Sequence, residues 1–196
     1  MRWVMLFLGI FIYGWVYASA MPSPNIVLND AFNALSRYTQ SVSEDVRATH
    51  NIHRSVQKLI EDLVDFELIA KLSVGRTAWS GASGMEQTTF VQTFKDYMFD
   101  TYLNQLLTYN ESNTQLVFDA FILKGNKAKV PCKLQTGSTT LALDFKLYLH
   151  DERWRIYDVE MDGVSLVSAF RIQFSSELNA GGLTGLTRSL DSKRNQ

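Results

Sequence analysis

Apolar and polar residues alternate without a break from Thr139 to His150. Successive side chains of a β-strand point to opposite faces, so this pattern predicts a strand with one buried and one wet face. Its apolar positions are Leu141, Leu143, Phe145, Leu147 and Leu149. Such a strand needs hydrogen-bonded neighbours, and the rest of the chain must therefore supply a sheet and a cover for its apolar face.

Three further segments near this strand have the same period of two. The four predicted strands are residues 116–123, 128–135, 139–150 and 153–161. The connections between the last three are two residues long or little more, which joins antiparallel neighbours. We therefore predict a four-stranded antiparallel meander. In the last strand the apolar parity changes after Ile156, which predicts a β-bulge near Tyr157-Asp158.

On both sides of the strands, apolar residues recur at the three- and four-residue steps of amphipathic helices. We expect a helical part over about 25–110, a sheet over about 114–162 and C-terminal helices over about 164–190. Within the helical part, a loop is predicted from Gly75 to Gly84, and the side chain of Trp79 in this loop is expected to be buried in a core. The order of helices, sheet and helices predicts an α+β fold in which helices cover a twisted antiparallel sheet.

The N-terminus has the three parts of a secretory signal peptide. Arg2 precedes an apolar run from Trp3 to Tyr17, and Ala18-Ser19-Ala20 has the small residues that signal peptidase reads. The apolar run is shorter than the roughly 20 residues of a membrane span. We therefore predict residues 1–20 as signal peptide, residues 21–192 as a single domain exported to the periplasm, and residues 193–196 as a frayed tail.

Charge and cysteine content narrow the possible partners. The chain has 19 basic and 20 acidic residues, so no global field favours nucleic acid or anionic lipid surfaces. Cys132 is the only cysteine and cannot form an internal disulfide. Its alternating apolar surroundings predict a buried thiol in a strand. We expect a monomer that recognises its partners through patches or pockets.

No catalytic or metal-binding constellation is visible in the sequence. Neither a Gly-x-Ser-x-Gly elbow nor a phosphate-binding glycine loop occurs. His50 and His53 have a spacing that suits a metal but no clear third ligand, and His150 is expected to be exposed at a hairpin tip. Asp158 is either a general base in a pocket or, as we favour, a carboxylate bonded to backbone donors at the bulge. We predict neither a metal nor a cofactor.

Three elements hold a large share of the apolar residues, which make up 46% of the chain. They are the helix face from Phe90 to Leu107, the strand face from Leu141 to Leu149 and the stripe from Val167 to Leu178. These elements form either one core or the walls of a ligand cavity, and periodicity alone does not distinguish the two.

Several stretches together resemble the MlaC, or toluene-tolerance, family of periplasmic lipid-binding proteins. They are Val64-Asp65-Phe66-Glu67-Leu68-Ile69-Ala70-Lys71-Leu72-Ser73-Val74-Gly75-Arg76, Trp79 with Ala82-Ser83, Phe90-x-x-x-Phe94 running to Tyr102, Trp154-Arg155-Ile156-Tyr157-Asp158-Val159-Glu160-Met161-Asp162-Gly163-Val164-Ser165-Leu166-Val167, Phe170-Arg171-x-Gln173-Phe174 and Gly182-Leu183-x-Gly185-Leu186. They cover nearly all of the predicted mature chain in order, and hopanoid-associated relatives share the pattern.

The resemblance implies a cystatin-like or nuclear-transport-factor-like fold with a deep apolar pocket for the acyl chains of a phospholipid, which is cargo, while its head group stays outside. It also implies transfer between an outer-membrane lipoprotein complex and an inner-membrane complex of an MCE-domain protein and an ABC transporter, which maintains outer-membrane lipid asymmetry without catalysis. The residues expected to line or flank the pocket are Trp79, Phe90, Phe94, Tyr97, Met98, Tyr102, Leu143, Phe145, Leu147, Val167, Phe170 and Phe174.

Three other interpretations stay open. A hopanoid carrier would share the family pattern but differ in cargo. A small enzyme of the cystatin-like or nuclear-transport-factor-like kind would use Asp158 as its catalytic carboxylate, and a second polar group should then lie near it. A structural adaptor would have a filled core and no lipid.

Overall fold

The computed structural model describes residues 22–40, 50–108 and 114–194, and the predicted signal peptide lies outside these residues. The chain forms an α+β structure, as predicted. Its elements, in chain order, are α1 (Pro24–Gln40), α3 (His50–Leu63), α4 (Phe66–Gly81), α5 (Gly84–Thr108), β1 (Thr114–Phe118), β2 (Ile122–Lys124), β3 (Lys127–Thr136), β4 (Thr139–His150), β5 (Arg153–Met161), β6 (Val164–Ser165) and α6 (Leu166–Arg194).

In the described part of the chain the antiparallel sheet has six strands instead of the four predicted. Its order is β1-β3-β4-β5-β6, and β2 also pairs with β3. The predicted first strand divides into β1 and β2 beside Pro131 of β3, which has no N–H to give to the ladder. There the N–H of Asp119 donates to the Pro131 carbonyl at 2.9 Å. The sixth strand, β6, follows the turn at Asp162-Gly163 and pairs with the end of β5.

The predicted bulge in β5 is confirmed. The register of β5 shifts between Lys146 and Leu147 of β4, which leaves Tyr157 as the extra residue. Because of this insertion, Val159 lies opposite Phe145 on the apolar face instead of pointing to the polar one. The bulge therefore keeps the apolar residues of β5 on one side along the whole strand.

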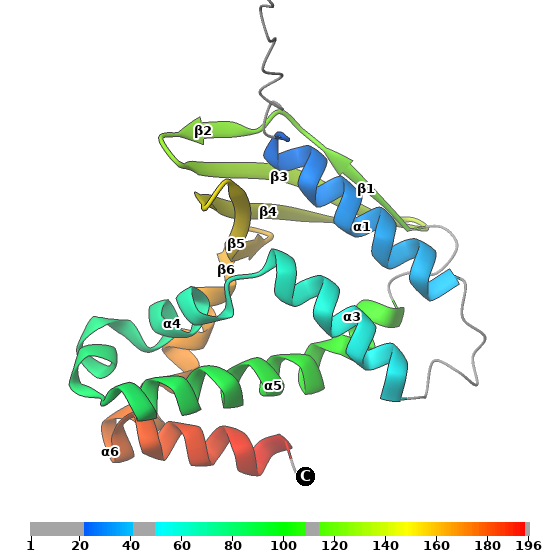
Figure 1. The fold of residues 1–196 in the computed structure, drawn as a ribbon. Coiled ribbons are helices and arrows are strands. Elements are labelled where there is room, and N and C mark those ends of the chain that lie inside the picture. The colour runs from blue at the N-terminus through cyan, green and yellow to red at the C-terminus, as the bar shows by residue number, and fades with distance from the viewer. Residues whose placement is uncertain (1–21, 41–49, 109–113, 195–196) are drawn as a thin grey trace, which may run out of the picture.

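The helices form two groups around this sheet (Figure 1). One is α1, which lies across the apolar face, where Leu28 packs against Ala128 and Leu147. The other is a layer of α4, α5 and α6, in which α5 and α6 run side by side. Between the two groups lies α3, and β5 and β6 lead the chain from the sheet into α6.

The loop predicted from Gly75 to Gly84 is wrong for most of its length, because α4 continues to Gly81. Only Gly75 departs from helical geometry, with φ 77° and ψ 168°, a conformation that glycine adopts without a steric penalty. The kink frees the carbonyl of Leu72, which accepts a hydrogen bond from Arg171 of α6 at 2.6 Å. The second part of α4 is held because Trp79 packs, partly buried, against the core of the helical layer.

The C-terminal region is a single element, α6, with a kink at Gly182, where φ is 61°. It ends at Arg194, whose guanidinium forms an ion pair with Asp100 of α5 at 2.7 Å. The helix thus continues two residues into the tail that we expected to be frayed. None of the helices in the described part of the chain is both long and apolar enough to cross a membrane.

Candidate functional site

The helical layer encloses a sealed apolar core, called here the helical cluster. Its buried members are Ile69, Ala70, Val74, Phe90, Phe94, Val167, Phe170, Phe174, Leu183, Leu186 and Leu190. At its centre, the ring of Phe94 lies edge-on to Phe170 at 5.1 Å and to Phe174 at 5.8 Å. Phe94 is 0% exposed. Aromatic side chains that contact one another this closely hold α5 and α6 together.

A second core, called the sheet cluster, lies between α1 and the sheet. Its buried members are Leu28, Ala128, Val130, Leu147, Trp154 and Ile156. The indole N–H of Trp154 donates to the carbonyl of Pro22 at 3.2 Å and ties the residues before α1 to β5. Val64, just after α3, forms a bridge with Ile156 and packs against both clusters. The junction between α3 and α4 is therefore where the two cores meet.

The apolar face of the sheet extends beyond the sheet cluster. Leu116, Leu134 and Leu141 pair in register across β1, β3 and β4, and together they are called the leucine row. All three side chains remain partly exposed, and none belongs to a buried cluster. In the next row of the sheet, Leu143 is 9% exposed and its partner Met161 is 47% exposed. This end of the sheet presents a partly open apolar surface.

The twelve residues predicted to line or flank a lipid pocket are distributed over the two clusters. Phe90, Phe94, Val167, Phe170 and Phe174 are buried in the helical cluster, and Trp79, Tyr97, Met98 and Tyr102 pack against it partly buried. Leu147 is buried in the sheet cluster, Phe145 packs against it, and Leu143 lies beside the leucine row in the register of β3 and β4. Their role as pocket lining stays a prediction.

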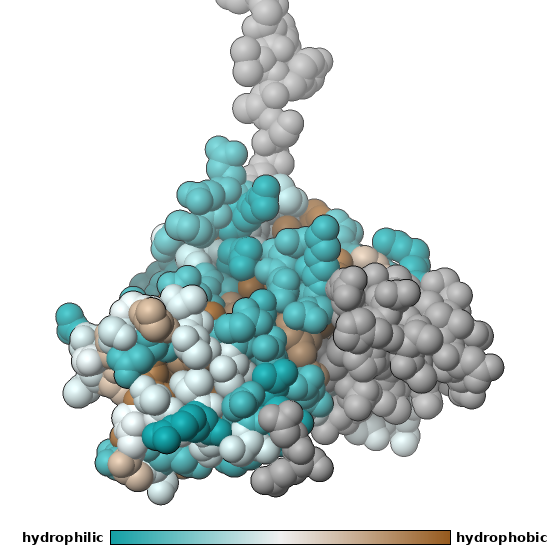
Figure 2. All heavy atoms as spheres, turned by 60° about the horizontal axis from the view of Figure 1, so that its bottom comes forward, coloured by the Kyte–Doolittle hydropathy of each residue, from teal (hydrophilic) through white to brown (hydrophobic). Residues whose placement is uncertain are grey.

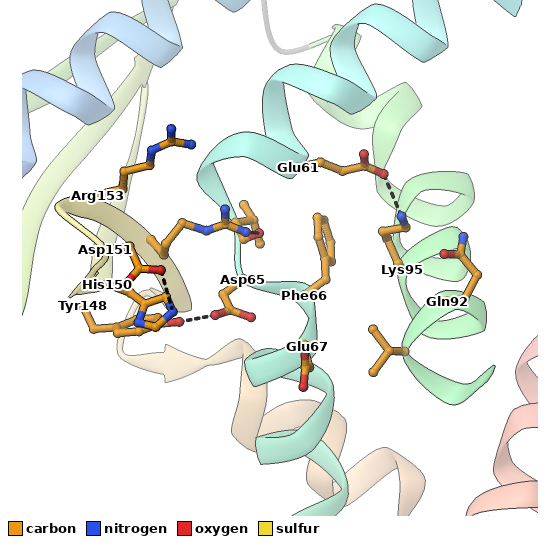
Figure 3. A pocket seen from close by; sticks show the side chains of 13 residues that line it. Glu61, Asp65, Phe66, Glu67, Gln92, Lys95, Tyr148, His150, Asp151 and Arg153 are labelled. Carbon is orange, nitrogen blue, oxygen red and sulfur yellow. Dashed lines mark hydrogen bonds and ion pairs between the residues drawn. The ribbon is translucent and has the colours of Figure 1, made fainter. Parts of the chain in front are cut away.

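A cavity of about 620 Å³ lies where the β4–β5 hairpin, the α3–α4 junction and α5 meet (Figure 3). It is lined by Glu61, Val64, Asp65, Phe66, Glu67, Val91, Gln92, Lys95, Tyr148, His150, Asp151, Arg153 and Arg155. Most of these are charged or polar, and none is among the twelve predicted residues. Phe66 lies between the hairpin and Lys95 of α5 in this view. The cavity is therefore a polar site beside the apolar cores, distinct from the apolar pocket that we predicted.

Asp65 joins the sheet wall of this cavity to α4. One carboxylate oxygen accepts the N–H of Leu68 at 2.8 Å and caps the helix. The other accepts the hydroxyl of Tyr148 (Figure 3). Burial, together with this bond to a carboxylate, raises the pKa of Tyr148 to about 12. The hydroxyl therefore stays a hydrogen-bond donor at neutral pH.

On the opposite wall, Glu61 of α3 forms an ion pair with Lys95 of α5 at 2.9 Å. Burial alone would raise the pKa of Glu61, but hydrogen bonds from Lys95 and Gln57 outweigh it and lower this pKa. The carboxylate of Glu61 thus stays charged at neutral pH, and the ion pair fixes the ammonium group of Lys95 at the cavity (Figure 3).

Asp158 is 5% exposed, and its oxygens are occupied by structural partners. It accepts the Nζ of Lys146 at 3.0 Å, the hydroxyl of Ser165 at 2.8 Å and the backbone N–H of Val167 at 3.2 Å. The preferred interpretation of a carboxylate bonded to a backbone donor is confirmed, although that donor lies at the start of α6 instead of at the bulge. A carboxylate held in this way supports a helix end, and this arrangement argues against a general base.

The remaining candidates for chemistry have structural explanations. Cys132 is buried as predicted, and burial raises the pKa of its thiol to about 12, which keeps it protonated and unreactive. His150 is exposed at the hairpin, as expected. The side chains of His50 and His53 lie outside the described residues. Among the residues that the structure describes, no group of three His, Cys, Asp or Glu side chains is arranged to hold a metal ion.

A second cavity, of about 540 Å³, lies between α4, α6 and the start of α5. Its lining residues are Val74, Thr77, Ala78, Gly81, Ala82, Glu86, Arg171, Ser175, Leu178, Asn179, Gly181, Gly182, Leu183 and Thr184. Figure 2, which brings the bottom of the molecule forward, shows a surface that is mainly hydrophilic or weakly polar, with only small separate apolar areas. The apolar residues of the helical layer are thus mostly turned inward.

An antiparallel sheet covered by helices, with a partly open apolar face and a carboxylate that serves as a helix cap, defines a small α+β protein. The chain belongs to the MlaC family, because the family model described as MlaC protein matches residues 30–192. The resemblance of its motifs to that family is therefore confirmed.

A solved structure supports the same fold. It is a phospholipid-binding protein from Ralstonia solanacearum, determined in complex with a phospholipid. The match has a TM-score of 0.77 and 21% sequence identity, and it covers 89% of this chain and 98% of that chain. At this level of identity the match establishes a common fold.

Sequence reasoning missed both the leucine row and the polar cavity. Leu116, Leu134 and Leu141 each occupy apolar positions of predicted strands, and a correct strand register would have placed them side by side. The cavity brings together segments near Glu61, Lys95 and His150. No local pattern signals such a meeting.

Proposed function

We propose that this protein is a periplasmic phospholipid carrier that moves lipid between an outer-membrane lipoprotein complex and an inner-membrane complex of an MCE-domain protein and an ABC transporter. It catalyses no reaction, and the bound phospholipid is cargo. Membership of the MlaC family supports this proposal, as does the shared fold with a protein solved in complex with a phospholipid. The contacts of Asp158 with the N–H of Val167, with Ser165 and with Lys146 support a structural role for this carboxylate.

The leucine row is the observation that carries the proposal. Partly exposed leucines in register on three strands offer an acyl chain an apolar surface next to the sheet cluster. We place the acyl chains against this row and against Leu143 and Phe145. The sealed aromatic residues of the helical cluster then flank the lipid and set the position of the helices.

The energetics fit a carrier. Burying a methylene group from water contributes about 0.8 kcal/mol, so two sixteen-carbon chains would contribute roughly 25 kcal/mol, more than the practical affinity limit of about 18 to 21 kcal/mol. The relevant exchange is between the protein and a bilayer, which are both apolar. The net free energy of loading is therefore small, and the partner complexes decide the direction of transfer.

Mass spectrometry of organic extracts from the natively purified protein tests the proposal, with a periplasmic protein of similar size as control. We expect stoichiometric phospholipid. Hopanoid in its place would assign the other cargo, and a stable protein without lipid would favour the adaptor or the enzyme.

A matched pair of variants tests the leucine row. Leu141→Asp places a charge on the apolar face, whereas Thr140→Asp places the same charge on the opposite, exposed face of β4. We expect Leu141→Asp to lose about tenfold or more of the copurifying lipid, because a carboxylate opposes contact with acyl chains. Thr140→Asp should retain it. Equal lipid in two folded variants would contradict the placement of the acyl chains.

A further inference from the structure

A row of threonines lies directly beyond the leucine row. Thr114, Thr136 and Thr139 pair in register across β1, β3 and β4, and together they are called the threonine row. Each stands two residues from the leucine of its own strand, and both registers run without a shift, so the two rows are on the same face of the sheet. The rows are therefore neighbours, about 7 Å apart along the strands.

The hydroxyl groups of this row are within reach of a ligand. The Oγ1 atoms of Thr114 and Thr136 lie 3.4 Å apart and can hydrogen-bond to each other. Thr136 is partly exposed and Thr139 is exposed. A hydroxyl that accepts a hydrogen bond from a neighbour still has its own hydrogen to donate. Thr136, which can accept from Thr114, and Thr139 are therefore the donors that a lipid on the leucine row would meet.

The face that holds both rows carries no charged side chain in β1, β3 and β4, three strands that the structure describes in full. The lysines and the aspartate of these strands point to the other face, where Lys129 and Asp144 form an ion pair at 2.6 Å. Cationic side chains are the usual partners of a phosphate group. Neutral hydroxyls without a cation beside them suit a neutral acceptor instead, such as an ester carbonyl.

Polarity and exposure change together along this face of β4. Thr139 is polar and exposed, Leu141 is apolar and partly exposed, and Leu143 is apolar and buried. A phospholipid has the same order of groups, from its polar head through its ester groups to its acyl chains. The face therefore matches a lipid whose ester end is at the β3–β4 hairpin and whose chains run towards the sheet cluster.

We propose that Thr136 and Thr139 donate hydrogen bonds to the ester carbonyl oxygens of the phospholipid cargo. The inference rests on the proposed function and names the group of the lipid that this end of the site recognises. An ester carbonyl leaves the hydrated surface of the bilayer together with its acyl chain, and a polar group that loses water without a new hydrogen bond costs free energy. With the first methylene groups on the leucine row, the ester groups reach the threonine row, whose hydroxyls replace the lost water.

The test compares two phospholipids that differ only in their ester carbonyls. Vesicles contain equal amounts of dioleoyl phosphatidylcholine and its diether analogue, which has the same head group and the same chains but no carbonyl oxygens. Purified protein is incubated with the vesicles and recovered, and both bound lipids are quantified by mass spectrometry. We expect the wild type to enrich the ester lipid over the ether lipid by about fivefold, the size of one net hydrogen bond.

Matched variants separate the hydroxyl groups from the shape of the side chains. Thr136→Val/Thr139→Val should bring the ratio close to one while the protein still binds lipid, since valine removes the hydroxyl but keeps a branched side chain that suits a strand. Thr136→Ser/Thr139→Ser keeps both hydroxyls and should keep the wild-type ratio. Thr140→Val changes the opposite face of β4 and should keep it too. If the double valine variant melts at a lower temperature, Thr139→Val alone, at an exposed position, should still give an intermediate ratio.

The outcomes distinguish this inference from the proposed function. An unchanged ratio in the folded valine variants would overturn the inference, as would a wild type that binds ester and ether lipid equally, and the proposed function would stand in both cases. Equal loss of both lipids in the valine variants would assign the hydroxyls to the phosphate group, which both lipids share, and would overturn the carbonyl assignment. A wild type that binds neither lipid would overturn the proposed function itself.

Discussion

The helical cluster and the leucine row contain the same kinds of residue but differ in exposure. Phe94 in the helical cluster is 0% exposed and has aromatic neighbours at 5.1 and 5.8 Å, whereas Leu141 in the leucine row remains partly exposed. Three helices converge on the cluster and close it, while α1 packs on only part of the apolar face of the sheet. Apolar residues in this fold thus have two uses: one group holds the helices together and the other is available to a ligand.

Truncation of Phe94 is expected to cause the largest loss of stability among the changes that compare the two regions. Phe94→Ala removes a fully buried ring between α5 and α6, so we expect the free energy of unfolding to fall by about 3–5 kcal/mol. Leu141→Ala should cost clearly less, about 1 kcal/mol, because its side chain is already partly exposed. Urea denaturation followed by circular dichroism measures both. Equal losses would show that the leucine row is as much a structural core as the helical cluster.

A second prediction concerns Asp158, which connects β5 of the sheet to the start of α6 in the helical layer. Asp158→Ala removes the acceptor for the N–H of Val167 at the start of α6 and leaves Lys146 with one acidic partner fewer. We expect a loss of about 2–3 kcal/mol in the free energy of unfolding, because a buried group loses its partner and a helix loses its cap. Asp158→Asn, which keeps an oxygen acceptor, should lose less.

The same two variants test the enzyme alternative. The carrier proposal expects any change in lipid transfer by Asp158→Asn to follow its change in stability. A variant that keeps the wild-type stability but abolishes a measured hydrolytic or isomerase activity would contradict the structural role of Asp158.

The alternation of apolar and polar residues predicted the strands and the bulge, because these features depend only on the geometry of neighbouring residues. The alternation in β4 and the parity change in β5 are consequences of strand geometry, and both the strand and the bulge at Tyr157 are confirmed. The wrong prediction of a loop at Gly75 arose because contacts between distant residues decide the structure there. The glycine in this helical stretch predicts the start of a loop, but the helix resumes one residue later, where Trp79 packs against the helical cluster.

The candidate site was less predictable because it depends on contacts between distant segments. Arg153 and Arg155 look like ordinary exposed positions of a strand, and only the fold brings Lys95 to the opposite wall. Likewise, periodicity identifies Phe90 and Phe94 as apolar without showing that their rings pack against each other. Wide aromatic faces therefore predicted burial correctly but left the pocket itself a prediction.

The smallest expected effect concerns how the stability of the contact between α5 and α6 depends on pH. Glu86, in the first turn of α5, accepts the hydroxyl of Thr184 of α6 at 2.6 Å and the N–H of Ser83 at 2.8 Å. These bonds lower the pKa of Glu86 from its ordinary value of 4.5 to about 2. A depressed carboxyl pKa stabilises the folded state fully above pH 4.5, and this contribution is lost as the pH falls from 4.5 towards 2.

Glu86→Gln should remove this titration while it keeps an acceptor for Thr184. Because the side chain is at the surface, we expect the melting temperature at neutral pH to fall by only about 2 °C. The difference between wild type and variant should shrink as the pH is lowered from about 6 to about 3, since the wild type alone loses the contribution. Thermal melts across this range measure it, with Thr184→Val as a variant that removes the first of the two bonds. A constant difference would mean that the connection between α5 and α6 depends on the shape of the side chain and not on its charge.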